Sequence, residues 1–119
     1  MEIKVYISQP YSRDDCQYLT EIKNILYGMV NTQKVTFNFL TTRRCLWTST
    51  AFDDLVQDIS KLAEADFVIF SKDWKHDNRC LIEHEIVVRY DIPHCEIGEI
   101  KTFFGNYIHS AFIFAIKKH

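Results

Sequence analysis

Three acidic residues in this chain could do chemistry, because nothing in their local sequence asks for them as packing residues. Asp58 lies in a segment of helical periodicity before the apolar run FVIF, Asp77 follows that run, and Glu83 comes six residues later. A carboxylate can act as a nucleophile or stabilise a positive centre, and a protonated carboxyl can donate a proton to a leaving group. The three acids therefore predict a carboxylate-based site if the fold brings them to one rim.

The segment 65–93 contains the elements that must position these acids. Phe67–Phe70 is too short for a helix and apolar throughout, as expected of a strand covered on both faces. A polar loop follows, and then a helix that Pro93 ends, with apolar residues at helical spacing that predict its buried stripe: Leu81, Ile82, Ile86, Val87 and Tyr90. Glu83 falls in the first turn of this helix. Ligands of open α/β sheets gather at the carboxyl ends of the strands, so we expect the site there. The neighbours His84 and Glu85 point in other directions around the helix, which favours exposed or structural roles for them.

The rest of the chain continues the alternation of strand and helix. In order, the patterns predict a strand over 3–7, a helix capped by Ser12 that ends near Gly28–Asn31, a strand over 35–39, and a helix capped by Ser49 or Thr50. This alternation predicts an α/β fold: a single domain with a doubly wound, flavodoxin- or Rossmann-like parallel sheet of four to five strands. Beyond Pro93, the segment 94–97 could be a fourth strand, and 108–116 a closing strand or helix with an interface role.

Composition excludes several classes of protein. A chain of 119 residues with 47% hydrophobic and 25% charged residues is typical of one soluble globular domain, without a membrane span. The formal charge of −2 argues against a polynucleotide partner. The four cysteines form no CxxC pair and no signal peptide precedes the first strand, so we expect a reduced, cytoplasmic protein. The His and Cys spacings match no zinc pattern, and we expect neither a metal nor a cofactor.

Several spaced features resemble the nucleoside 2-deoxyribosyltransferase-like superfamily, and in particular its small, uncharacterised members from bacteria and phages. They are the opening KVYISQPYS, Trp47 before the second long helix, Asp58 seven residues before ADFVIF, and Trp74 nine residues ahead of a Glu-His pair. The resemblance runs from Ile3 to Pro93. It implies that Glu83 is the nucleophile that takes the sugar of a nucleoside or nucleotide, assisted by Tyr6 and Asp58, with Trp47 and Trp74 near the substrate.

Asp77 and two departures from the family pattern bear on the substrate. An acidic residue six positions before the nucleophile contacts the base in the nucleoside-transferring branch, so the resemblance leans towards nucleosides over nucleotides. Gln9 with Pro10 replaces the small residues that usually follow strand one, and Asn78, Arg79 and Cys80 replace the usual glycines before the nucleophile. Gln9 and Arg79 could crowd the pocket, bind an unusual substrate, or mark a member that has lost activity.

The implied reaction is cleavage or transfer of an N-glycosidic bond, which passes through an oxocarbenium-like centre that a carboxylate can capture. Glu83 would be the nucleophile, Tyr6 would orient it, and Asp58 or Asp77 would protonate the departing base. Two other classes stay open. VYISQPYSRDD with Cys80 and Glu83 resembles a TIR-like domain that cleaves NAD, and the altered first loop would also suit a non-catalytic nucleotide-binding module.

The aromatic residues of the C-terminal segment predict a partner copy of the chain. They are Phe103, Phe104, Tyr107, Phe112 and Phe114, more than the last element of a small sheet needs for its own core. Family members commonly complete each pocket from an adjacent subunit, so we expect a homodimer or a higher homo-oligomer.

Overall fold

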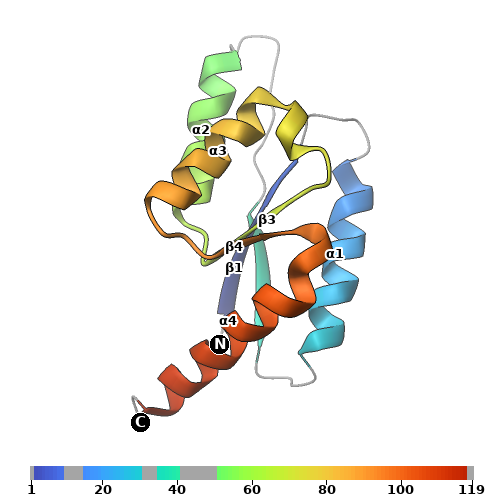
Figure 1. Cartoon of the computed structure of the whole chain (residues 1–119), viewed down its shortest axis with the longest axis vertical. Coiled ribbons are helices and arrows are strands. Elements are labelled where there is room, and N and C mark those ends of the chain that lie inside the picture. Colours follow the sequence, from blue (N-terminus) through green and yellow to red (C-terminus); the bar gives the residue numbers. More distant parts are fainter. Residues whose placement is uncertain (1, 10–14, 31–34, 41–50, 118–119) are drawn as a thin grey trace.

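The structure is a computed structural model, which describes residues 2–9, 15–30, 35–40 and 51–117 (Figure 1). Its helices and strands are, in chain order, β1 (Glu2–Ser8), α1 (Asp15–Met29), β2 (Thr36–Leu40), α2 (Ala51–Ala63), β3 (Phe67–Phe70), α3 (Asn78–Arg89), β4 (His94–Glu96) and α4 (Ile100–Lys117). Short 3-10 turns at Trp74–His76 and Ile97–Glu99 precede α3 and α4. The predicted alternation of strand and helix is confirmed.

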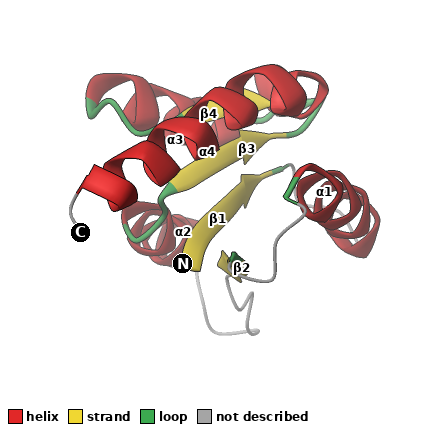
Figure 2. Ribbon diagram, turned by 90° about the horizontal axis from the view of Figure 1, so that it is seen from below, coloured by secondary structure: helices red, strands yellow, loops and turns green. Residues whose placement is uncertain are grey.

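The four strands form one parallel sheet in the order β2-β1-β3-β4. Helices α1 and α4 cover one face of the sheet, and α2 and α3 cover the other (Figure 2). This is the doubly wound arrangement, with the strand order of a flavodoxin-like sheet. The predicted fold class and strand number are therefore confirmed. The strand order switches at β1, because β2 is added on one side of it and β3 on the other.

The strand β1 separates two hydrophobic cores. Ile3 and Val5 belong to the core under α1 and α4, whereas Tyr6 belongs to the core under α2 and α3. Side chains alternate between the two faces of a strand, so Ser8 points to the same side as Tyr6. Two consecutive residues of one face, a tyrosine and a serine, thus reach the side of the sheet that carries Asp58 and Glu83.

The predicted buried stripe of α3 is partly wrong. Val87 is buried and Ile86 partly buried, but three other residues of the stripe are exposed: Leu81, Ile82 and Tyr90. The buried face of the helix carries Cys80 and Glu83 together with Val87. A helix can turn only one face to the sheet, and Glu83 finds polar partners there while Cys80 is small enough to pack tightly. Because Glu83 lies on the buried face, the helix is rotated about its axis relative to the orientation that the apolar residues predict.

In the C-terminal part, the structure shows a fourth strand followed by a closing helix. The segment 94–97 contains the edge strand β4, and 108–116 is the later part of the helix α4. The predicted helix caps lie outside the described residues: Ser12, Ser49 and Thr50.

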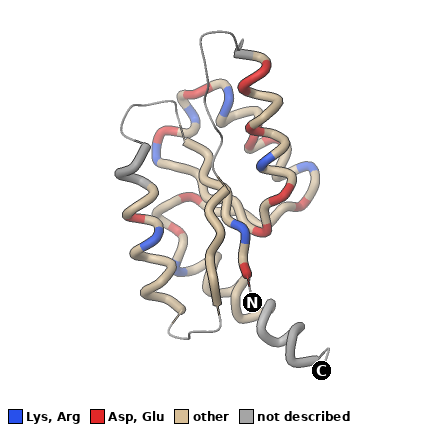
Figure 3. The backbone as a smooth tube through the Cα atoms, turned by 180° about the vertical axis from the view of Figure 1, so that it is seen from behind, with Lys and Arg blue, Asp and Glu red and all other residues tan. Residues whose placement is uncertain are grey.

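The surface carries charges of both signs. Figure 3 shows lysine and arginine interspersed with aspartate and glutamate along the part of the chain that is drawn in colour. Within the described ranges, the structure contains no helix long and apolar enough to cross a membrane.

Candidate functional site

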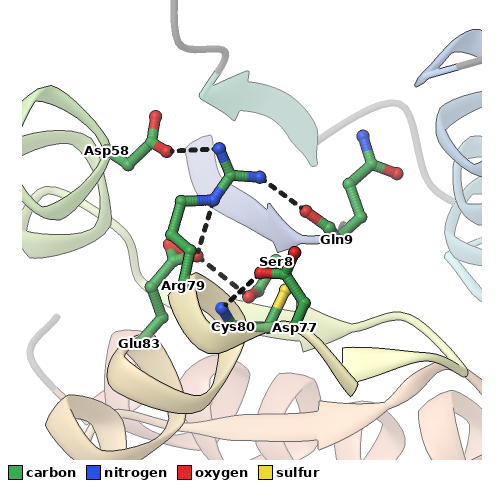
Figure 4. Close-up of polar contacts among 7 residues, drawn as sticks. All are labelled: Ser8, Gln9, Asp58, Asp77, Arg79, Cys80 and Glu83. Carbon is green, nitrogen blue, oxygen red and sulfur yellow. Dashed lines mark hydrogen bonds and ion pairs between the residues drawn. The ribbon is translucent and has the colours of Figure 1, made fainter. Parts of the chain in front are cut away.

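The polar residues that the sequence singled out converge at the carboxyl ends of β1 and β3. The two strand ends are tied together where the Ser71 backbone N–H donates to the Ser8 carbonyl at 2.9 Å. Helix α2 brings Asp58 to this edge, and α3 brings Arg79 from its first turn and Glu83 from its second (Figure 4). In a doubly wound sheet this is the place where the strand order reverses and where ligands bind. The prediction that Glu83 lies in the first turn is wrong, because α3 begins at Asn78.

Glu83 is the centre of this cluster, and its side chain is completely buried. The Ser8 hydroxyl donates to Glu83 Oε1 at 3.1 Å. The other carboxylate oxygen, Oε2, is buried and has no hydrogen-bond partner among the described residues. A buried carboxylate oxygen without a hydrogen-bond donor lowers the stability of the fold, so its presence calls for an explanation. Ser8 thus holds one carboxylate oxygen of Glu83, the Tyr6 hydroxyl also stabilises the carboxylate, and Oε2 has no donor at hydrogen-bond distance among the described residues.

Arg79 links Glu83 to the rest of the site. Its Nη1 lies 3.0 Å from Asp58 Oδ2, and its Nη2 donates to the backbone carbonyl of Gln9 at 2.8 Å. Its Nε lies 4.0 Å from Glu83 Oε1, close enough for a strong charge interaction but not for a hydrogen bond. The Arg79 side chain is 18% exposed, and that of Asp58 is 2% exposed. The ion pair is therefore largely shielded from water. In such a shielded place, opposite charges attract each other more strongly than they do in water.

The surroundings of Glu83 change its ionisation. Burial raises the pKa of Glu83 to about 7, while the Tyr6 hydroxyl, the charge of Arg79 and the Ser8 hydroxyl oppose this shift. Burial lowers the pKa of Arg79, but the nearby carboxylates of Asp58 and Glu83 outweigh it and raise that pKa overall, so the guanidinium stays charged. Near neutral pH Glu83 therefore interconverts readily between carboxylate and carboxylic acid. Such a poised pKa is typical of catalytic groups.

Tyr6 lies two residues before Ser8 on the same face of β1 and is buried. Burial, followed by the negative charge of Glu83, raises the pKa of the Tyr6 hydroxyl far above its usual range. The hydroxyl therefore keeps its proton at any ordinary pH and acts as a neutral neighbour of the carboxylate. Tyr6, Asp58 and Glu83, to which the resemblance gives the catalytic roles, thus lie together, and Arg79 lies among them.

Asp77 and Gln9 lie at the margin of the cluster. Asp77 is the N-cap of α3, where its Oδ1 accepts a hydrogen bond from the backbone N–H of Cys80 at 3.0 Å. Gln9 joins the site through its backbone carbonyl, while its side chain points away from Arg79 (Figure 4). Trp47 lies outside the described residues.

Trp74 belongs to a second cluster, beside the edge strand β4. Its ring stacks on that of His84, with the centroids 4.1 Å apart, and its Nε1–H donates to Glu96 Oε1 at 2.9 Å. Both Trp74 and His84 also contact the ring of Phe70. This packing gives His84 the structural role that was expected, and Glu85 lies on the surface in a pair with Arg89.

Ser8 is the residue of this site that sequence reasoning missed. Its only signal was position: it lies two residues after Tyr6 and at the end of the first strand, so that alternation places both side chains on one face. A serine at the end of a strand is common in turns, which made its role ambiguous without the fold.

The described residues do not hold a metal site, since no group of three or more His, Cys, Asp and Glu side chains is placed to bind an ion there. Chemically, the arrangement offers a buried carboxylate with one free oxygen, a charged guanidinium and a second carboxylate. Such a set can deliver a nucleophile or a negative charge to an electron-poor carbon.

Comparison with known proteins shows the fold and nothing more specific. No protein-family model matches the sequence, and no curated protein matches it. A crystal structure of a conserved protein from Enterococcus faecalis is similar, with a TM-score of 0.58 and 12% sequence identity over 81% of this chain. The chain spans 63% of the length of that protein. At this level of identity the likeness supports the α/β architecture alone.

Proposed function

We propose that the protein is a member of the nucleoside 2-deoxyribosyltransferase-like superfamily that cleaves or transfers the N-glycosidic bond of a nucleoside or nucleotide. The single observation that carries the proposal is the Glu83 carboxylate, fully buried at the carboxyl edge of the sheet with Oε2 free and Oε1 held by Ser8. Burying a glutamate costs free energy of folding, so its presence in the core suggests a functional role. The carboxyl edge of the strands is also where α/β sheets bind ligands.

In the proposed reaction, Glu83 Oε2 attacks C1′ of the sugar and forms a glycosyl ester. The C1′–N bond breaks, its electron pair goes to the base, and the base takes a proton from an acid of the site or from water. Water, or a second base, then attacks C1′ and gives up a proton to a carboxylate of the site or to solvent, while the ester C1′–O bond breaks and its electron pair restores the Glu83 carboxylate. The attack needs the ionised form of Glu83, so activity should rise with pH through the pKa near 7.

The other residues support this reaction in distinct ways. Tyr6, a neutral hydroxyl on the same face of β1, orients the nucleophile. Asp58 meets Arg79 as an ion-paired carboxylate, which makes it an electrostatic partner of the site more than a source of protons. Asp77, half-buried at the start of α3, is the proposed contact for the base. Gln9 and Trp47 would line the approach to the substrate, whereas Trp74 stacks on His84 and donates to Glu96, which gives it a structural role.

The test is turnover of a panel of purified nucleosides, deoxynucleosides, their 5′-monophosphates and NAD, with separation of the products by chromatography. A released free base indicates hydrolysis, and a new nucleoside formed in the presence of a second base indicates transfer. Glu83→Gln and Glu83→Ala should lose at least about a thousandfold in kcat. Glu85→Gln is the matched control, because Glu85 lies on the surface of the same helix.

The same panel separates the alternatives. Cleavage of NAD with no activity on nucleosides would support the TIR-like function. Binding of a nucleoside or nucleotide in calorimetry, without any turnover, would support the non-catalytic module.

We also propose that the protein works as a homo-oligomer in the cytoplasm. In the described part of α4, Phe104 is buried in the core and Tyr107 packs against Phe67, whereas Phe103 is 48% exposed and available to a partner. The buried thiols of Cys80 and Cys95 are free, which suits a reducing compartment. Light scattering coupled to gel filtration tests the assembly, and a monomeric mass of 14.1 kDa with full activity would contradict it.

A further inference from the structure

Arg79 contacts three separate elements of the site at once. Its guanidinium pairs with Asp58 of α2, donates to the carbonyl of Gln9 after β1, and lies beside the Glu83 carboxylate on its own helix (Figure 4). Few surface arginines are held in this way, since an exposed side chain of this length is usually mobile. All three nitrogens of the planar guanidinium thus face an oxygen acceptor: Nη1 faces Asp58, Nη2 faces Gln9 and Nε faces Glu83.

We propose that Arg79 is a positioning residue that joins the Asp58 and Glu83 carboxylates into one rigid unit and directs the free oxygen of Glu83 towards the substrate. The inference rests on the proposed function for its catalytic consequence. Its structural part, the control of Glu83 by Arg79, can be measured without any substrate.

The first argument is charge. The groups that face Glu83 are Tyr6 and Ser8 from β1, Asp58 from α2 and Arg79 from α3. The negative charge of Asp58 disfavours ionisation of Glu83, and Arg79 is the one positive group among these neighbours. A cation placed between the two carboxylates allows Glu83 to ionise beside Asp58, and the proposed attack requires the ionised form of Glu83.

The second argument is direction. Ser8 and Arg79 both lie on the side of Glu83 Oε1, at 3.1 Å and 4.0 Å, whereas Oε2 has no donor at hydrogen-bond distance in the described part of the chain. The Tyr6 hydroxyl also stabilises this carboxylate. A carboxylate held through one oxygen presents the other in a fixed direction. Such preorganisation lowers the barrier of a nucleophilic attack, because the geometry is set before the substrate arrives.

The third argument is the shape of the side chain. A lysine ammonium is a compact charge that could reach either Asp58 or Glu83, but it cannot span two carboxylates and a carbonyl in one plane. The Gln9 carbonyl adds a hydrogen bond to Nη2, which fixes the plane of the guanidinium. The inference therefore predicts that lysine replaces Arg79 only in part.

The test follows the ionisation of Glu83 by NMR, using protein labelled with ¹³C at the glutamate side-chain carboxyl and Glu83→Gln to assign the signal. The variants are Arg79→Ala and Arg79→Lys, and Arg89→Ala is the matched control, because Arg89 is an exposed arginine that pairs with Glu85 on the same helix. Loss of the neighbouring cation should raise the pKa of Glu83 by about 1 or more in Arg79→Ala. Arg79→Lys should give an intermediate value, and Arg89→Ala should match the wild type.

Activity provides the second readout. In Arg79→Ala, kcat should fall at least about tenfold at pH 7 with a smaller change in KM, and part of the loss should return at pH 9, where Glu83 is ionised again. A purely structural role would not produce this recovery. If Arg79→Ala is too unstable to study, Arg79→Gln removes the same charge with a longer polar side chain, and it should raise the pKa of Glu83 in the same direction.

The failures can be told apart. A Glu83 titration that is the same in Arg79→Ala and in the wild type would overturn the role of Arg79, whatever the activity. Absence of turnover in the wild type on the whole panel would instead refute the proposed function and leave the titration as evidence on Arg79. Full activity of Arg79→Ala with an unchanged pH profile would also overturn the inference.

Discussion

Replacing Glu83 by glutamine should stabilise the protein, and more so at higher pH. Burial raises the pKa of Glu83 from the ordinary value of 4.5 to about 7. Between these two pH values the folded chain keeps a proton that the unfolded chain has lost. The wild type therefore loses stability as the pH rises from about 4.5 to 7, and above that range the loss stays constant. Glutamine has nearly the same shape and no charge to bury, so the variant is free of this loss.

The size of the effect follows from the same pKa. The stability of the wild type falls by up to about 1.4 kcal/mol per pH unit across this range. Between pH 5 and pH 8 the unfolding free energy of Glu83→Gln, relative to that of the wild type, should accordingly rise by about 2 to 3 kcal/mol. The direction is secure because the side chain is completely buried, where water cannot screen the charge.

Urea denaturation followed by circular dichroism at pH 5, 6, 7 and 8 measures this difference. Glu85→Gln is the control, and it should change stability by less than about 1 kcal/mol, because Glu85 is in an exposed ion pair. A difference in unfolding free energy between Glu83→Gln and the wild type that does not change with pH would refute the reasoning. So would a variant that is destabilised at pH 8.

Three further predictions concern the fold around the site. Phe104→Ala should cost about 3 to 5 kcal/mol, since the ring is fully buried, whereas Phe103→Ala should cost less than about 2 kcal/mol; equal losses in thermal unfolding would contradict the placement of α4. Asp77→Ala should cost about 0.5 to 2 kcal/mol in denaturant unfolding and Asp77→Asn much less, because both aspartate and asparagine cap a helix. Burial, with smaller effects of nearby acids, raises the pKa values of the Cys80 and Cys95 thiols to about 12, so both should resist alkylation at pH 8 until the protein unfolds; rapid labelling of the native protein would show that they are accessible.

The sequence was sufficient for the architecture, because the patterns of strand and helix were unambiguous up to Pro93. Phe67–Phe70 is a short apolar run, and it forms a strand that is buried along its whole length. The doubly wound topology then follows from right-handed crossovers. The last helix was harder to predict, since the apolar segment 108–116 has no periodicity that separates helix from strand.

The central residues of the site were predictable, apart from Ser8, but the contacts between them were not. The position of Glu83 after a buried strand marked it, and the face of Tyr6 follows from alternation along β1. The contacts of Arg79 could not be predicted from the sequence. Arg79 stands where the family usually has a glycine, and this difference alone does not show that its side chain points into the site. The exposed positions of Leu81 and Ile82 were missed for a related reason: hydrophobic spacing assumes that apolar residues take the buried face, and here Glu83 takes it.

The most direct test of the central claim is a search for a sugar bound covalently to Glu83. The protein is incubated with nucleosides that carry fluorine at C2′, which slows the release of a glycosyl ester by destabilising the positive centre, and is then analysed by intact-protein and peptide mass spectrometry. The account predicts a mass increase equal to the fluorinated sugar, located in the α3 peptide that contains Glu83 and absent from Glu83→Gln. Turnover of a nucleoside without any adduct, and with full activity retained in Glu83→Gln, would contradict it.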